Sequence, residues 1–145
     1  MKKVNLLSMY DSGVFDITAN SIDATNAYKV LKFKREGRKA YESYADSEKS
    51  IQEEVGIMDA EAFDKERHDL LANNSNPARL EEMNKQFERY CELRRALLDE
   101  EVTFSCNAIP YALFHELQRE NQHIQNKPLN IFEELLEGIL WEAPE

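Results

Sequence analysis

The feature that most constrains the fold of this chain is a helical spacing of apolar residues sustained over roughly 33 residues. The segment begins near Asn20 or Ser21, and Gly56 supplies a stop signal at its end. A helix of this length would span about 50 Å, which is unusually long for a globular protein and typical of a helical hairpin or coiled coil. Its apolar positions are Ala27, Val30, Phe33, Ala40, Tyr41, Tyr44, Ile51 and Val55.

A second long helix is predicted to begin at Asn76. Asn is a favourable N-cap, and Pro77 suits the first helical position because its missing N–H needs no partner there. Apolar residues then recur by three and four as far as Leu97, although Arg94 interrupts the heptad character. We therefore expect a long antiparallel hairpin in which residue 55 lies opposite residue 77.

Shorter elements are predicted around this hairpin. Capping residues and apolar spacing indicate four short helices, over residues 3–11, 59–72, 111–120 and from Asn130 to Trp141. Val14–Thr18 and Val102–Cys106 alternate as strands do, so we predict that they pair as a small two-stranded β-ribbon. The predicted fold class is mainly α, with short accessory helices on the hairpin, and residues 1–145 form a single domain.

The amino-acid composition limits the classes of protein to which this chain can belong. The chain has 145 residues, a net charge of -10, 42% hydrophobic residues and only 4 Gly and 4 Pro, which favours a folded, α-rich protein. Polar residues interrupt any signal-peptide core near the start, and no apolar run approaches the ~18 residues of a membrane span. Cys91 and Cys106 are too few for a disulfide framework. We expect a cytoplasmic protein with reduced thiols and no membrane contact.

Residues 27–41 form a basic block in this acidic chain, with six bases against the single acid Glu36. In the predicted register the block faces Asp99–Glu101, so one interpretation is an internal charge match that selects register. The alternative is a docking surface for a polyanion or acidic partner. Tyr28, Phe33 and Tyr41 are assigned mainly to the apolar stripe. This leaves no aromatic side chain among the exposed bases and argues against nucleic acid. The bases are Lys29, Lys32, Lys34, Arg35, Arg38 and Lys39.

The sequence offers little support for catalysis. Glu120 and His123 have the spacing of one half of a carboxylate-bridged di-metal site, but the equivalent positions before His68 and His115 are Lys65 and Ala112. Four scattered glycines build no phosphate loop. We therefore predict no catalytic residue, no metal site and no cofactor.

The last segment is distinctive in charge. From Leu129 to Glu145 it has five acids and no Lys or Arg, and it contains the only tryptophan. One interpretation is that this segment packs on the hairpin. The other is that Ile139, Leu140 and Trp141 bind a partner protein or a second copy, since aromatic side chains concentrate in binding hot spots.

The order of elements resembles small helical proteins encoded by phages and prophages. The resemblance rests on the Lys-rich stretch 27–32, AYKVLK, and on the stretch 97–102, LLDEEV, at the end of the second long helix. It implies a helical fold and no established activity.

These features favour a non-catalytic structural, assembly or adaptor protein that acts through self-association or partner binding, and we expect a homo-oligomer. An alternative is an acidic inhibitor that presents carboxylates to a host nucleic-acid enzyme. A second alternative is an enzyme of unknown reaction, which would need a pocket that brings a histidine beside several carboxylates.

Overall fold

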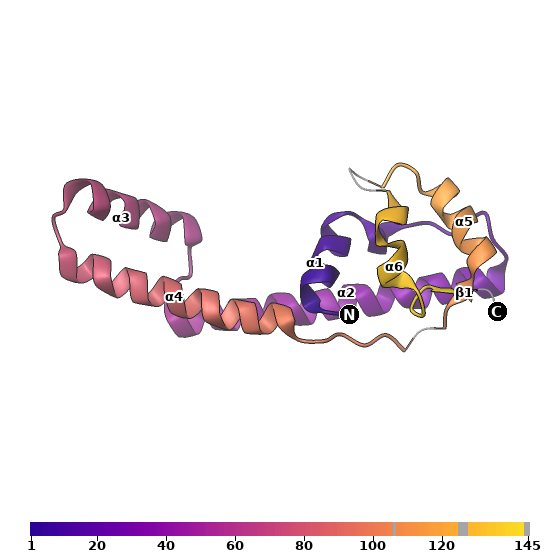
Figure 1. The fold of residues 1–145 in the computed structure, drawn as a ribbon, viewed down its shortest axis with the longest axis horizontal. Helices are drawn as coiled ribbons and strands as arrows, with labels where there is room; N and C mark the ends of the chain where they lie inside the picture. Colours follow the sequence, from indigo (N-terminus) through magenta and orange to yellow (C-terminus); the bar gives the residue numbers. More distant parts are fainter. Residues whose placement is uncertain (106, 125–127, 144–145) are drawn as a thin grey trace. The chain divides into compact units, whose positions relative to one another are not determined.

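The computed structural model of the protein describes residues 1–105, 107–124 and 128–143. The fold is mainly α, as predicted (Figure 1). Its contacts divide the chain into two compact units, Met1–Ser43 with Glu101–Glu145, and Tyr44–Glu100. We call them the terminal unit and the hairpin unit. The long helix α2, Ala24–Val55, is continuous and contributes residues to both.

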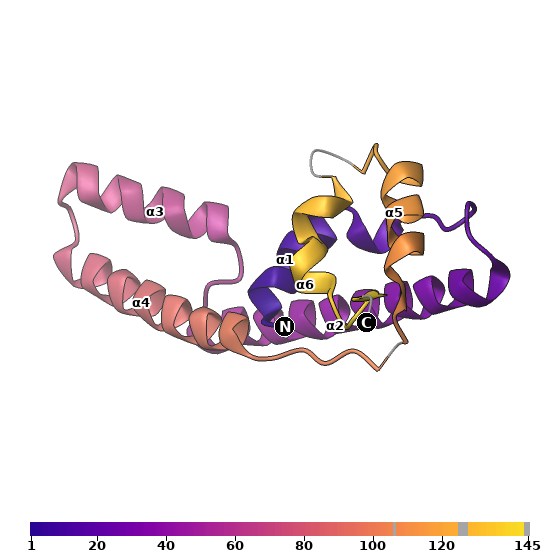
Figure 2. The same cartoon turned by 45° about the vertical axis from the view of Figure 1, so that its right-hand side comes forward.

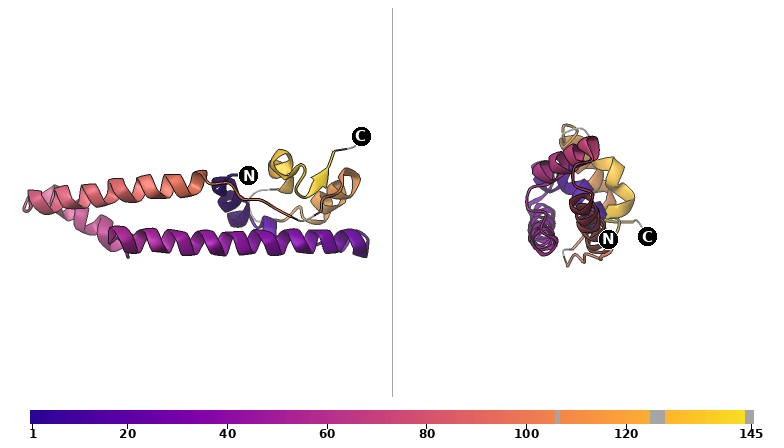
Figure 3. Two further views of the ribbon diagram at one scale, coloured as in Figure 1. Left: turned by 90° about the horizontal axis from the view of Figure 1, so that it is seen from below. Right: turned by 90° about the vertical axis from the view of Figure 1, so that its left-hand side faces the viewer.

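The terminal unit gathers short helices along one side of the first part of α2 (Figures 1 and 3). Its core is formed by apolar side chains from every one of these helices, with Phe33 of α2 fully buried among them. The other elements of the unit are α1 (Lys3–Asp11), η1 (Val14–Asp16), β1 (Ile109–Pro110), α5 (Tyr111–Glu120), η2 (Leu129–Phe132), α6 (Glu133–Leu136) and β2 (Trp141–Glu142).

A close approach at Gly37 brings η1 against α2. The Phe15 ring lies where a Cβ on Gly37 would be, and Phe15 also packs on Phe33 with ring centroids 5.4 Å apart. On the same helix, Phe104 from the extended segment after Glu100 packs against Phe33 at 5.5 Å.

The hairpin unit contains residues 44–55 of α2, α3 (Ala60–Asn73) and α4 (Pro77–Asp99). Three of the predicted helix signals are present. Gly56 has the positive φ of 78° that a helix stop requires. The Asp59 side chain accepts a hydrogen bond from the amide of Ala62, and the Asn76 side chain accepts one from the amide of Arg79. Helices α3 and α4 lie side by side (Figure 2).

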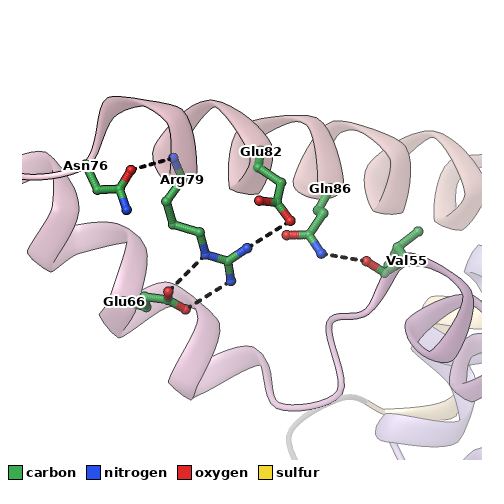
Figure 4. A network of polar contacts seen from close by, with 6 residues as sticks. All are labelled: Val55, Glu66, Asn76, Arg79, Glu82 and Gln86. Atoms are coloured by element: carbon green, nitrogen blue, oxygen red, sulfur yellow. Dashed lines mark hydrogen bonds and ion pairs between the residues drawn. The ribbon is translucent and has the colours of Figure 1, made fainter.

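The register of α4 against α2 differs from the prediction. The Gln86 side-chain amide donates to the Val55 carbonyl at 3.0 Å, so Val55 lies opposite Gln86 and not opposite Pro77. The reason is α3, which covers the start of α4: Arg79 pairs there with Glu66 at 3.0 Å (Figure 4). The first turns of α4 therefore pack against α3, and the end of α2 contacts α4 near Gln86.

The predicted β-ribbon and last helix also need correction. Residues Val14–Asp16 form a 3₁₀-helix, 102–105 are not in a strand, and Cys106 lies outside the described residues. The strand pair is instead β1 with β2, which run parallel with Ile109 opposite Trp141. The predicted last helix ends at Leu136, because Gly138 with φ 77° turns the chain and Trp141 enters β2.

Candidate functional site

A stripe of apolar and cationic side chains runs along the exposed side of the first part of α2. Tyr28 is 57% exposed and Leu31 is 38% exposed, and Arg35 is exposed one turn further on. Residues three and four positions apart on a helix lie on one face, so these side chains form a continuous surface. We call it the outer face, and its members are Tyr28, Leu31, Lys32, Arg35, Arg38 and Lys39.

Packing on the other side of the helix fixes this face toward solvent. Val30 is 1% exposed and Phe33 is fully buried, and both belong to the core of the terminal unit. The short helices of the unit lie on that core side (Figure 3). Lys29 and Lys34, the remaining members of the basic block, are half-buried at the two margins of the outer face.

Some charges of the basic block contact other parts of the terminal unit. Arg38 pairs with Asp16 of η1 at 2.8 Å. Beside it, burial lowers the pKa of Lys34, and the positive charge of Arg38 lowers it further. Glu36, the single acid of the block, accepts hydrogen bonds from the amide and the hydroxyl of Ser105. Arg35 and Lys39 are exposed.

Glu101 does not make the predicted contact with the basic block. The Glu101 carboxylate binds the amino group of Met1 at 2.8 Å, so this acid is paired with the N-terminus. Asp99 and Glu100 belong to the hairpin unit, and their pairing with the basic block stays a prediction.

The position of Tyr28 differs from the prediction. The sequence pattern predicts that it lies on the apolar stripe, whereas in the structure its side chain is exposed among the bases. The signal was present in the sequence: Tyr28 is two residues before Val30, which is roughly 200° around a helix of 3.6 residues per turn. Phe33 does lie in the core, and Tyr41 stacks on Tyr10 with ring centroids 3.5 Å apart.

The three predicted partner-binding residues at the C-terminal end lie mostly inside the terminal unit. Leu140 is 1% exposed, Trp141 is 8% exposed and Ile139 is half-buried. The Trp141 ring packs against Tyr111 at 4.5 Å, and its indole N–H donates to the Glu133 carbonyl at 2.8 Å. This burial favours the interpretation in which the segment packs within its own chain.

Other side chains of the same segment face outward. Ile131 is 58% exposed and Leu135 is 37% exposed, and Glu134 and Glu137 are exposed beside them. We call these four residues the acidic face. They lie opposite the buried Leu136 and its neighbours in η2, which anchor the segment in the core.

Glu120, which has the spacing of half a metal site in the sequence, binds the segment that precedes α2. Its carboxylate accepts hydrogen bonds from the amides of Asn20 at 2.9 Å and Ser21 at 2.6 Å, and from the Thr18 hydroxyl. Burial alone would raise the pKa of Glu120, but these hydrogen bonds outweigh it and lower the pKa to about 2. Helix α5 ends at Glu120, so His123 is not on the same helix.

A polar cluster joins α2 and α4 within the hairpin unit. Glu48 accepts from the Tyr90 hydroxyl at 2.9 Å and from Arg94 at 3.3 Å. Burial would raise the pKa of Glu48, but its hydrogen bonds and the charge of Arg94 lower it. Burial and the neighbouring Glu48 raise the pKa of Tyr44 to about 12. Arg94, which interrupts the heptad in sequence, is therefore a partner of Glu48.

Comparisons with known proteins give no family for the chain. No protein-family model matches it, and neither curated proteins nor solved structures gave a match. Within residues 1–105, 107–124 and 128–143, no helix has the length and apolar character needed to cross a bilayer. The same residues contain no group of three or more His, Cys, Asp or Glu side chains placed to hold a metal ion.

Proposed function

We propose that this protein is a non-catalytic assembly or adaptor protein that acts by helix-mediated self-association. The observation that carries the proposal is the outer face of α2, where exposed Tyr28 and Leu31 lie among Arg35, Arg38 and Lys39. Tyr and Arg are the side chains that most often dominate protein–protein interfaces. Apolar side chains grouped on an exposed face gain free energy when a partner covers them.

The mixture of side chains favours a protein partner over nucleic acid. A phosphate backbone would satisfy the cations of the outer face but would leave Leu31 uncovered. A protein segment that carries both carboxylates and apolar side chains would satisfy both kinds of group. The net charge of -10 also opposes binding of a polyanion to the chain as a whole.

Light scattering over a range of protein concentrations tests the proposal. The wild-type protein should show a mass above that of the 16.9 kDa chain at high concentration. The double variant Tyr28→Ala/Leu31→Ala should remain close to the chain mass. The matched control is Val4→Ala/Leu71→Ala, which truncates side chains that are 47% and 56% exposed elsewhere, and it should associate as the wild type does.

Two outcomes would count against self-association through this face. One is a wild-type protein that remains a single chain at the highest concentration. The other is a Tyr28→Ala/Leu31→Ala variant that associates as strongly as the wild type. If the wild type stays monomeric, a pull-down from host lysate tests the inhibitor alternative, which predicts recovery of a nuclease or polymerase.

A further inference from the structure

We infer that the outer face of α2 binds the acidic face of a second copy of this chain. The inference rests on the proposed function and names the surface that meets the outer face. Both faces belong to the terminal unit. Each combines two exposed apolar side chains with charges, and the charges are of opposite sign on the two faces.

The acidic face is built so that its apolar side chains cannot turn inward. The buried side of η2 and α6 is already filled by Leu129, Phe132 and Leu136, none of which is more than 3% exposed. Ile131 and Leu135 are four residues apart and therefore share the other side. Covering them needs another chain or another part of this one.

The charge of this segment is uniform. Glu134 and Glu137 are exposed beside the two apolar residues, and the sequence has no Lys, Arg or His after Lys127. The outer face offers Arg35, Lys39 and the other bases against them. Opposite charges on facing surfaces steer association and fix its register.

Another surface with an exposed apolar residue, on α3, is less complementary to the outer face than the acidic face is. Leu71 on α3 is 56% exposed, but a hollow beside it is lined by Asp64, Arg67 and His68. Arg67 places a positive charge there, which would oppose the positive charge of the outer face. The four residues of the acidic face include no base.

The proposed contact joins two different patches of identical chains. Such a contact closes into a ring or a reciprocal dimer, or continues as a chain of copies. Because exposed charges contribute to it, association should weaken as the salt concentration rises.

Charge reversal tests the pairing directly. One variant, Arg35→Glu/Lys39→Glu, places two carboxylates on the outer face and cancels its net positive charge, and the other, Glu134→Lys/Glu137→Lys, makes the acidic face basic. Each variant alone loses the attraction between the two faces. In a mixture of the two variants, the new carboxylates of the first meet the new lysines of the second, while the other contact joins the two faces that keep their wild-type charges. Sedimentation velocity should show self-association weakened about tenfold or more for each variant alone, and association recovered in the mixture. Lys65→Glu/Lys85→Glu is the control for Arg35→Glu/Lys39→Glu, because it changes the net charge by the same amount at exposed positions of the hairpin unit.

The outcomes separate this inference from the proposed function. Suppose that Glu134→Lys/Glu137→Lys associates as strongly as the wild type, whereas Arg35→Glu/Lys39→Glu does not associate. The acidic face is then not the surface that binds the outer face, but the outer face remains the interface. Absence of recovery in the mixture also overturns the pairing. Retention of a labelled DNA duplex by the wild type, lost in Arg35→Glu/Lys39→Glu, would replace the second copy with a phosphate backbone. Circular dichroism verifies folding, and if a reversed variant loses helix, Glu134→Gln/Glu137→Gln should still reduce the salt dependence of association.

Discussion

Gly37 in the middle of α2 offers a sharp test of the packing in the terminal unit. In an exposed helix interior, replacing Gly by Ala stabilises a protein by about 1 kcal/mol. Here a Cβ on Gly37 would lie under 3.0 Å from three carbons of the Phe15 ring. Phe15 is 1% exposed and also packs on Phe33, so the ring has little room to move.

The magnitude follows from these two opposing effects. Overpacking of a filled core costs about 1–3 kcal/mol, and a clash with three atoms of one ring belongs at the upper end of that range. After subtracting the gain in helix propensity, Gly37→Ala should lower the free energy of unfolding by about 2 kcal/mol. For a chain of this size the midpoint of thermal unfolding should fall by roughly 4–10 °C.

A double-mutant cycle read out by urea unfolding isolates the clash. With Phe15→Ala already in place, Gly37→Ala should stabilise the protein by about 1 kcal/mol, so the coupling between the two sites is about 3 kcal/mol. Ser43→Ala, at an exposed position of the same helix, should stay within about 0.5 kcal/mol of the wild type. A rise in stability for Gly37→Ala in the wild-type background would refute the close approach.

Three further predictions concern the remaining contacts and are measured by urea unfolding. Trp141→Ala should cost about 3–5 kcal/mol because the ring is core, whereas Ile131→Ala at an exposed site should be nearly neutral; a neutral Trp141→Ala would contradict core packing. Because the pKa of Glu120 is lowered, its ionised carboxylate contributes fully to stability above about pH 4.5, and this contribution is lost as the pH falls toward about 2. Glu120→Gln should therefore weaken the fall in the free energy of unfolding over this pH range. An unchanged pH profile would argue against the hydrogen-bonded carboxylate. Asn76→Ala should cost about 1 kcal/mol through loss of the N-cap, and an equal cost for exposed Asn73→Ala would remove that explanation.

The helices were predictable because their ends depend on neighbouring residues. Gly56 stops α2, Asp59 caps α3, and Asn76 with Pro77 starts α4, each through groups within three residues in the chain. The strong apolar periodicity between these signals then left little choice of structure. The prediction of a mainly α hairpin is confirmed for these reasons.

The register and the small elements were not predictable because they depend on distant residues. The placement of Gln86 opposite Val55 follows from α3 covering the start of α4, which no local pattern reports. Val14–Asp16 alternates like a strand, yet it forms a 3₁₀-helix whose Phe15 fits over Gly37. Tertiary packing outweighed the local β pattern here.

The candidate site was only partly predictable from the sequence. All six bases of the block were identified from the sequence, but the apolar half of the surface was missed because Tyr28 was counted with the core. Likewise, the C-terminal segment was identified as apolar and acidic, but a turn at Gly138 places Trp141 in the core, whereas Ile131 lies at the surface.

Sedimentation equilibrium of the wild-type protein at several salt concentrations is the decisive test of self-association through these two faces. We expect a mass above that of one chain at low salt and high protein concentration, falling toward the single-chain mass as added salt screens the outer face and the acidic face. A single-chain mass under every condition would contradict it, and so would association that strengthens steadily with salt, because apolar contacts alone would then hold the copies together.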